Sequence, residues 1–122
     1  MGQFTTVVMI GGETSYEDLY DDEEFAGPGN TWRRSSESEW LRSTERGNVH
    51  GFVVALSNGS VDGVPNFDLV GPVPLDEFAT TEPFKQSVER ARGLWEEFRA
   101  HALALGVPLP NGRLYLAEIE VA

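Results

Sequence analysis

The 122-residue sequence contains no cysteine, one lysine and two histidines, and it has no long apolar run. Without cysteine the chain cannot form disulfides, Cys-ligated zinc sites, iron–sulfur clusters or a cysteine nucleophile. No stretch approaches the roughly 18 apolar residues that span a bilayer, and the first ten residues lack the basic start of a signal peptide. We therefore expect a cytoplasmic protein with no membrane association and no cofactor.

Basic side chains are scarce, nine against twenty acidic ones, and the formal net charge is −11. Residues 1–31 hold seven carboxylates and residues 51–82 hold five, and neither segment has a basic side chain. Four arginines lie between them, in residues 32–50. An acidic surface repels nucleic-acid phosphates and attracts basic proteins. The charge therefore argues against binding to duplex nucleic acid and favours a basic protein partner.

The composition, 40% hydrophobic and 24% charged, is typical of a folded chain, and the length suits one domain over residues 1–122. Alternating apolar residues predict strands over 3–10, 49–56 and 113–121. Gly11-Gly12 is expected to end the first strand. A further strand is predicted within 64–73, at a sheet edge because of its prolines.

The strand predicted over 113–121 should bury one of its faces and expose the other. Its odd-numbered apolar side chains are expected in the core, whereas Glu118 and Glu120 should meet solvent or a partner. The predicted core residues are Tyr115, Ala117, Ile119 and Val121.

An apolar stripe at alternating spacings of four and three residues predicts a long helix over 81–105, with Thr81 as N-cap and Gly106 as stop. Its members are Phe84, Val88, Ala91, Trp95, Phe98, Ala102 and Leu105. Capping-box patterns at 14–17 and 36–39 predict two more helices, the second ending at Gly47.

This order of elements indicates an α+β domain: a small antiparallel sheet with helices packed on one face, in the ferredoxin-like βαββαβ order. The alternative is another α+β order, in which the prolines of residues 65–74 remove one strand. The second face of such a sheet must also be covered, and a homodimer is one way to cover it.

One candidate ligand site is the arginine-bearing segment. Arginine binds carboxylate or phosphate through two parallel hydrogen bonds, tryptophan offers a stacking face, and the helix predicted from Ser36 presents free amides. His50 could act as an acid or base near neutral pH, although no partner stands at a recognised spacing. The alternative is that the arginines pair with carboxylates of their own chain. The candidate ligand-binding residues are Trp32, Arg33, Arg34, Trp40 and His50.

A second candidate site is the acidic run at residues 21–24 with two tyrosines before it. The run lacks the D-x-D-x-D-G spacing of calcium loops, so no metal site is expected. A solvated acidic loop is the alternative to a partner-binding surface. The candidate partner-binding residues are Tyr16, Tyr20, Asp21, Asp22, Glu23 and Glu24.

These features favour a small acidic binding module that engages a basic protein surface, as inhibitors, immunity proteins and anti-defence proteins do. The segments 13–24 and 62–82 would steer the partner, and Tyr20, Trp32 and Trp40 would anchor it. The alternative is a protein that binds or sequesters an anionic small molecule such as a nucleotide, or a small enzyme acting on one. Catalysis is not favoured, because no nucleophile, base and charge-stabilising group stand at a known spacing.

Overall fold

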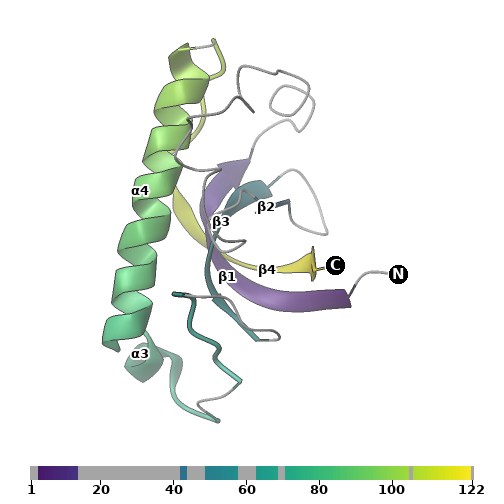
Figure 1. The fold of residues 1–122 in the computed structure, drawn as a ribbon, viewed down its shortest axis with the longest axis vertical. Coiled ribbons are helices and arrows are strands. Elements are labelled where there is room, and N and C mark those ends of the chain that lie inside the picture. Colours follow the sequence, from purple (N-terminus) through teal and green to yellow (C-terminus); the bar gives the residue numbers. More distant parts are fainter. Residues whose placement is uncertain are drawn as a thin grey trace.

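The computed structural model describes residues 3–13, 42–43, 49–57, 63–68, 71–104 and 106–121. Within them the strands form one antiparallel sheet in the order β2-β3-β1-β4, and α4 lies across one face of it (Figure 1). The elements are β1 (Gln3–Glu13), β2 (Arg42–Ser43), β3 (Val49–Leu56), α3 (Leu75–Phe78), α4 (Glu82–Ala104) and β4 (Arg113–Val121). The predicted α+β class is confirmed.

The chain passes from β3 through α4 to β4, and β1 lies between these two strands in the sheet. β3 and β4 are both antiparallel to β1, so they run parallel to each other with β1 between them. This is a split βαβ unit.

The long helix α4 confirms the predicted apolar stripe. Its buried residues are Phe84, Ser87, Ala91, Leu94, Trp95, Phe98 and Ala102, whereas Val88 is half-buried and Leu105 lies outside the described residues. Gly106 ends the helix with a φ of 88°. The Gly106 and Val107 amides donate to the carbonyls of Leu103 and Ala102, which is the Schellman arrangement.

The N-terminal cap of α4 differs from the prediction. The carbonyl of Thr81 accepts the first helical hydrogen bond, from the amide of Lys85. The Thr81 hydroxyl, however, donates to the carbonyl of Phe78 at 2.8 Å, so it ties α4 to α3. Thr81 therefore occupies the cap position, but its hydroxyl bonds the preceding turn.

The prediction that Gly11-Gly12 ends the first strand was wrong, because β1 continues to Glu13. Gly11 pairs with Gly51 of β3 on one side and with Arg113 of β4 on the other. A Cβ on Gly11 would overlap the backbone carbonyl of His50. These glycines mark a close approach of two backbones inside the sheet and not a turn.

The strand predicted within 64–73 does not form in the described residues of that segment. Its pairing consists of isolated bridge residues, Val64 and Asn66, of which Asn66 forms a parallel bridge with Leu56, and the chain then leads to α3. Proline has no amide hydrogen to donate to a ladder, so Pro65 and Pro72 each remove a pairing site. The ferredoxin-like order is consequently not confirmed, and this segment follows the alternative reading.

The helix predicted from Ser36 to Gly47 was wrong at Arg42 and Ser43, which form β2 and pair with Gly51 and His50. The capping signal is local, whereas the edge of β3 offers a whole ladder of backbone partners, and tertiary pairing prevails. The remainder of that helix, and the one predicted near residues 14–20, lie outside the described residues.

A β-bulge in β3 fixes α4 onto the sheet. The register shifts between Val8 and Met9, leaving Val54 as the extra residue on β3. The Ser87 hydroxyl donates to the carbonyl of Val54 at 2.6 Å. The Arg90 guanidinium donates to the carbonyl of Val53 at 3.0 Å. Two polar side chains of α4 therefore hold the helix over β3.

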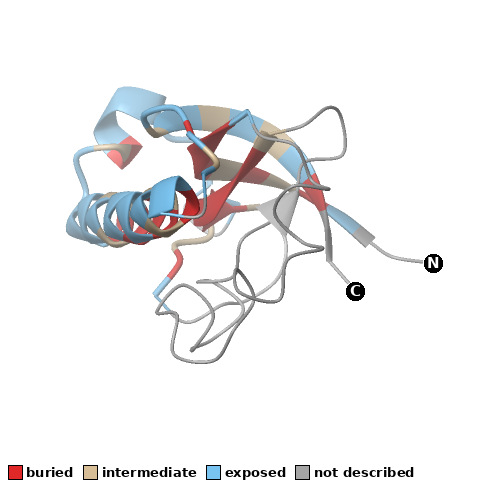
Figure 2. Cartoon of the chain, turned by 90° about the horizontal axis from the view of Figure 1, so that it is seen from above, coloured by how far each residue is buried: buried red, intermediate tan, exposed pale blue. Residues whose placement is uncertain are grey.

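Buried residues lie on both faces of the sheet. Figure 2 shows buried segments on the side of α4 that faces the strands, and the outer side of the helix is exposed. On the opposite face, Val7 and Met9 are 0% exposed within a single chain. That face therefore gives no reason for a dimer, and the expected homodimer stays an untested prediction.

Candidate functional site

The face of β4 on the helix side is left largely uncovered. α4 packs mainly on β3 and β1. Leu114 and Leu116 of β4 are paired with Ile10 and Val8, so they point to the same side of the sheet as α4. They are nevertheless 54% and 76% exposed.

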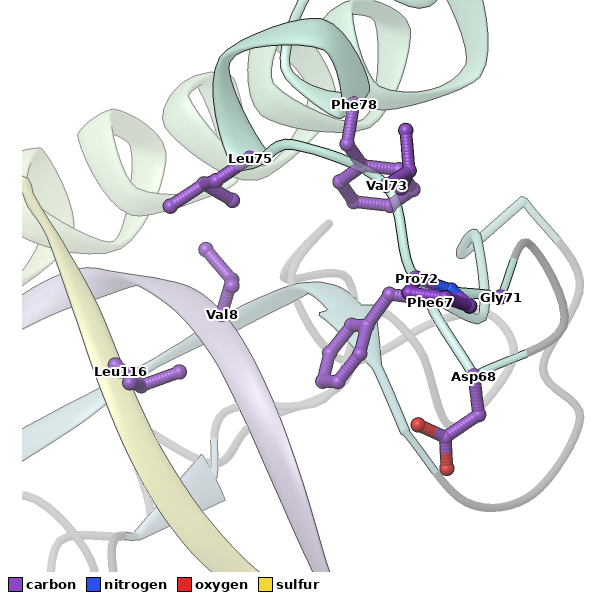
Figure 3. Close-up of a pocket in the computed structure, with 9 residues that line it drawn as sticks. All are labelled: Val8, Phe67, Asp68, Gly71, Pro72, Val73, Leu75, Phe78 and Leu116. Atoms are coloured by element: carbon purple, nitrogen blue, oxygen red, sulfur yellow. The ribbon is translucent and has the colours of Figure 1, made fainter.

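A groove of about 510 Å³ lies between this uncovered face and the chain leading into α3 (Figure 3). Val8 and Leu116 line it from the strands, and Leu75 points toward Val8 from the other side (Figure 3). The remaining lining residues are Phe67, Asp68, Gly71, Pro72, Val73 and Phe78. The volume falls within the range of roughly 300–1,000 Å³ that is common for ligand pockets.

The upper side of the groove is positioned by Phe78. Its ring is buried and makes edge contacts with Phe67 and Phe84, at centroid distances of 6.4 and 5.2 Å. The amide of Phe78 donates to the carbonyl of Pro74, which closes the single turn of α3. Because Phe78 anchors that turn in the core, Leu75 at its start is held over the groove and is 71% exposed.

Exposed carboxylates lie in the segments that form the groove. Asp68 lines it, Asp76 and Glu77 follow Leu75 in α3, and all three are exposed. Glu118 is exposed two residues after Leu116, hence on the same face of β4. We call these four carboxylates the acidic rim. The rim would attract a positively charged group and repel an anion.

Of the candidate ligand-binding and partner-binding residues, only His50 lies in the described part of the chain, although the predicted steering segment 62–82 is described at 63–68 and 71–82. His50 stands in β3 between Gly12 and Ser43, its side chain is 2% exposed, and the groove does not include it. The other candidates lie outside the described residues, so the structure does not test them: Tyr16, Tyr20, Asp21, Asp22, Glu23, Glu24, Trp32, Arg33, Arg34 and Trp40.

The sequence reasoning missed Leu75, Leu114 and Leu116. The prediction for the opposite face of β4 was right at Ile119, which is buried, and partly right at Tyr115, which is half-buried. The prediction that Glu118 is exposed was also right. The signal for the leucines was present, because residues 114, 116 and 118 must share one face of a strand. An apolar pair on the face assigned to solvent identifies an unusual surface.

Among the described residues that line the groove, Asp68 is the one with an ionisable side chain, and most of the others offer apolar contact. Within the described residues, no three His, Asp or Glu side chains are grouped so that they could hold a metal ion. The described helices include none that is long and apolar enough to cross a membrane. The sequence matches no protein-family model, no curated protein and no solved structure. Its function is therefore inferred from the groove and the acidic rim.

Proposed function

We propose that this protein is a small acidic binding domain that engages a basic protein partner through the groove. One observation carries the proposal: exposed Leu75 and Leu116 face the same groove, with the acidic rim around them. Burying either leucine against a partner would contribute about 1.5–3 kcal/mol. Apolar clusters on a surface commonly mark interaction sites, and carboxylates around them steer a cationic partner toward them.

The groove supports a protein partner better than an anionic small molecule. Its described lining is largely apolar apart from Asp68, and the acidic rim would repel a phosphate or carboxylate ligand. The anionic-ligand hypothesis depends instead on Trp32, Arg33 and Arg34, which lie outside the described residues. The groove therefore favours the role of an inhibitor, immunity or anti-defence protein acting on a basic target.

The ferredoxin-like order is also kept as a proposal. What supports it is the split βαβ unit made by β3, α4 and β4 around β1. With β2 in place of the strand predicted within 64–73, the full order still requires a helix between β1 and β2, in residues 14–41. Helical dichroism of a peptide covering residues 14–41 in the presence of trifluoroethanol would test it, and a coil spectrum would count against it.

The binding proposal is tested with a fluorescein-labelled nine-residue peptide, the leucine–arginine peptide, in which five threonines alternate with arginine, leucine, leucine and arginine. As a strand it places the leucines and arginines on one face, and it is used below the concentration at which it self-associates. We expect fluorescence anisotropy to report binding that weakens as salt is raised. A matched peptide with glutamate in place of both arginines should not bind, because the acidic rim repels it. Equal binding of the two peptides would refute the proposal.

Leu116→Ser is the decisive variant, and Leu103→Ser is its control. Both replacements leave the net charge unchanged, and Leu103, on α4, is 65% exposed against 76% for Leu116. Loss of one apolar contact should weaken binding of the leucine–arginine peptide at least tenfold in Leu116→Ser, since tenfold corresponds to about 1.4 kcal/mol. Leu103→Ser should bind like the unchanged protein. If both variants bind alike, the groove is not the site.

A further inference from the structure

The two edges of the sheet are very different. In the described part of the chain, one edge is β2, which has two residues, and the other is β4, which has nine. β4 pairs with β1 along one side, and no described strand pairs along its outer side. Such an edge presents a row of backbone N–H and C=O groups that another extended chain can pair with.

β4 has few of the features that normally protect an edge strand. Proteins blunt edges with short strands, prolines, bulges and charged side chains, and of these β4 has the charged side chains, at positions 113, 118 and 120. Arg113–Val121 contains no proline, and its register with β1 is continuous from Gln3↔Val121 to Gly11↔Arg113. The irregularity in the sheet lies in the β1–β3 ladder instead. β4 is therefore a long, regular strand whose outer side is suited to pairing.

The side chains of β4 indicate what an added strand would carry. On the helix side, two exposed leucines, Leu114 and Leu116, are followed by exposed Glu118. Directly opposite residues on neighbouring strands have Cβ atoms about 4.5–5.5 Å apart and interact. A complementary strand would place apolar side chains opposite the leucines and a basic side chain opposite Glu118.

We propose that the partner binds by strand addition: an extended apolar–basic segment pairs with the outer side of β4. Its apolar side chains lie against Leu114 and Leu116 beside the groove, and a basic side chain lies against Glu118. This inference rests on the proposed function and specifies the binding mode at the same surface. Backbone hydrogen bonds supply affinity in such complexes, and the alternating side chains supply specificity.

Charge favours a partner segment over a second copy of this chain. Two copies would each bring a net charge of −11 to the contact, and each would carry its own acidic rim beside the leucines. A basic segment neutralises the rim instead of doubling it.

The test uses the leucine–arginine peptide in two N-methylated forms, one methylated at every threonine amide and one at every leucine and arginine amide. In an extended strand, the amides of alternate residues point to the same edge, so each form blocks one edge only. Strand addition predicts that one form binds like the parent peptide and that the other binds at least tenfold more weakly.

Other outcomes separate the two proposals. If both methylated forms bind alike while Leu116→Ser still weakens binding of the unmethylated peptide, strand addition is overturned and the groove remains the site. If the parent peptide does not bind, the proposed function itself fails. Sedimentation of the protein alone gives a further outcome: a dimer that Leu114→Ser dissociates would assign the edge to a second copy and overturn the choice of a partner segment.

Glu118→Gln tests the charged contact, with Glu89→Gln as control. Both carboxylates are exposed, but Glu89 lies on α4. Glu118→Gln should weaken binding of the leucine–arginine peptide about two- to fivefold at low salt, and the difference in affinity should vanish at high salt. An equal effect of the two variants would contradict a basic side chain opposite Glu118.

Discussion

Replacing Gly112 by alanine should destabilise the protein, because Trp95 fills the space that a Cβ would need. The indole of Trp95 is 0% exposed, and its nitrogen donates to the carbonyl of Pro110 at 3.1 Å. A Cβ on Gly112 would lie 2.8 Å from Cδ1 of Trp95 and 2.9 Å from Cγ2 of Ile10. Non-bonded carbon atoms prefer about 3.5–4.0 Å, so the methyl group would overlap two buried side chains at once.

The expected cost follows from the rigidity of both neighbours. The hydrogen bond to Pro110 fixes the indole, and Ile10, which is 0% exposed, cannot move away without disturbing the sheet. Overpacking of this kind typically costs about 1–3 kcal/mol. Alanine also has less conformational freedom than glycine in the unfolded chain, which offsets this loss of stability by about 0.4–1 kcal/mol. We therefore expect Gly112→Ala to lower the free energy of unfolding by about 1–2 kcal/mol.

Gly93→Ala is the matched control, and its effect should have the opposite sign. Gly93 is exposed within α4, and a Cβ placed there would meet nothing within 4 Å. Alanine in a helix interior is favoured over glycine by about 0.8–1 kcal/mol, so this variant should be more stable.

Urea unfolding followed by circular dichroism at 222 nm measures both variants. A shift of the midpoint without a change of slope reports stability alone. If Gly112→Ala is as stable as the unchanged protein, or gains stability as Gly93→Ala does, the packing of Trp95 against Gly112 is not the constraint described above.

The same urea measurement checks three further predictions. Ser87→Ala should cost about 1–3 kcal/mol, because a buried carbonyl loses its donor at 2.6 Å; no loss would mean that this hydrogen bond does not hold α4 on β3. Gly106→Ala should cost about 1 kcal/mol, because its φ is 88°, and a gain in stability would contradict the Schellman ending. Leu116→Ser should cost less than about 1 kcal/mol of stability, because the Leu116 side chain is 76% exposed. Phe98→Ala should cost about 3–5 kcal/mol, because Phe98 is 1% exposed. Similar losses in the two variants would show that Leu116 belongs to the core.

The elements that the sequence predicted best are those whose pattern is long or bounded on both sides. The stripe of α4 repeats over many turns and is followed by Gly106, so period and stop signal agree. β3 was predicted with its observed bounds, Val49–Leu56, because its apolar run is compact. In both cases local pattern and tertiary burial favour the same structure, which is the condition for a reliable reading.

The errors arose where a local signal competed with pairing between distant segments. Gly11-Gly12 resembles a turn in one dimension, but Gly51, about forty residues later, lies directly against it. Arg42 and Ser43 follow a capping box, yet β3 pairs with them. Neighbouring residues do not show that Gly11 pairs with Gly51, or that Arg42 and Ser43 pair with β3. Hydrophobic periodicity and turn signals therefore could not predict the end of β1 or the presence of β2.

The groove was beyond sequence reasoning for a related reason. Its walls come from β1, β4, the segment around Phe67 and the start of α3, which are far apart in the chain. Periodicity assigns Leu114 and Leu116 to one face of a strand, but it does not say whether a helix covers that face. The sequence interpretation used charged and aromatic runs instead. The acidic segment 62–82 supplies Asp68, Asp76 and Glu77 to the acidic rim, whereas the aromatic and arginine-bearing runs lie almost entirely outside the described residues.

The position of α4 explains why the leucines of β4 are exposed but not why they are leucines. Ser87 holds the helix over the β3 bulge. A helix about 10 Å wide covers roughly two strands spaced about 4.8 Å apart, so a helix on β3 and β1 leaves β4 open. Glu118 shows that this open face accepts a charged side chain. Folding would therefore permit polar residues at 114 and 116, and the proposed partner-binding surface gives a reason for the apolar side chains there.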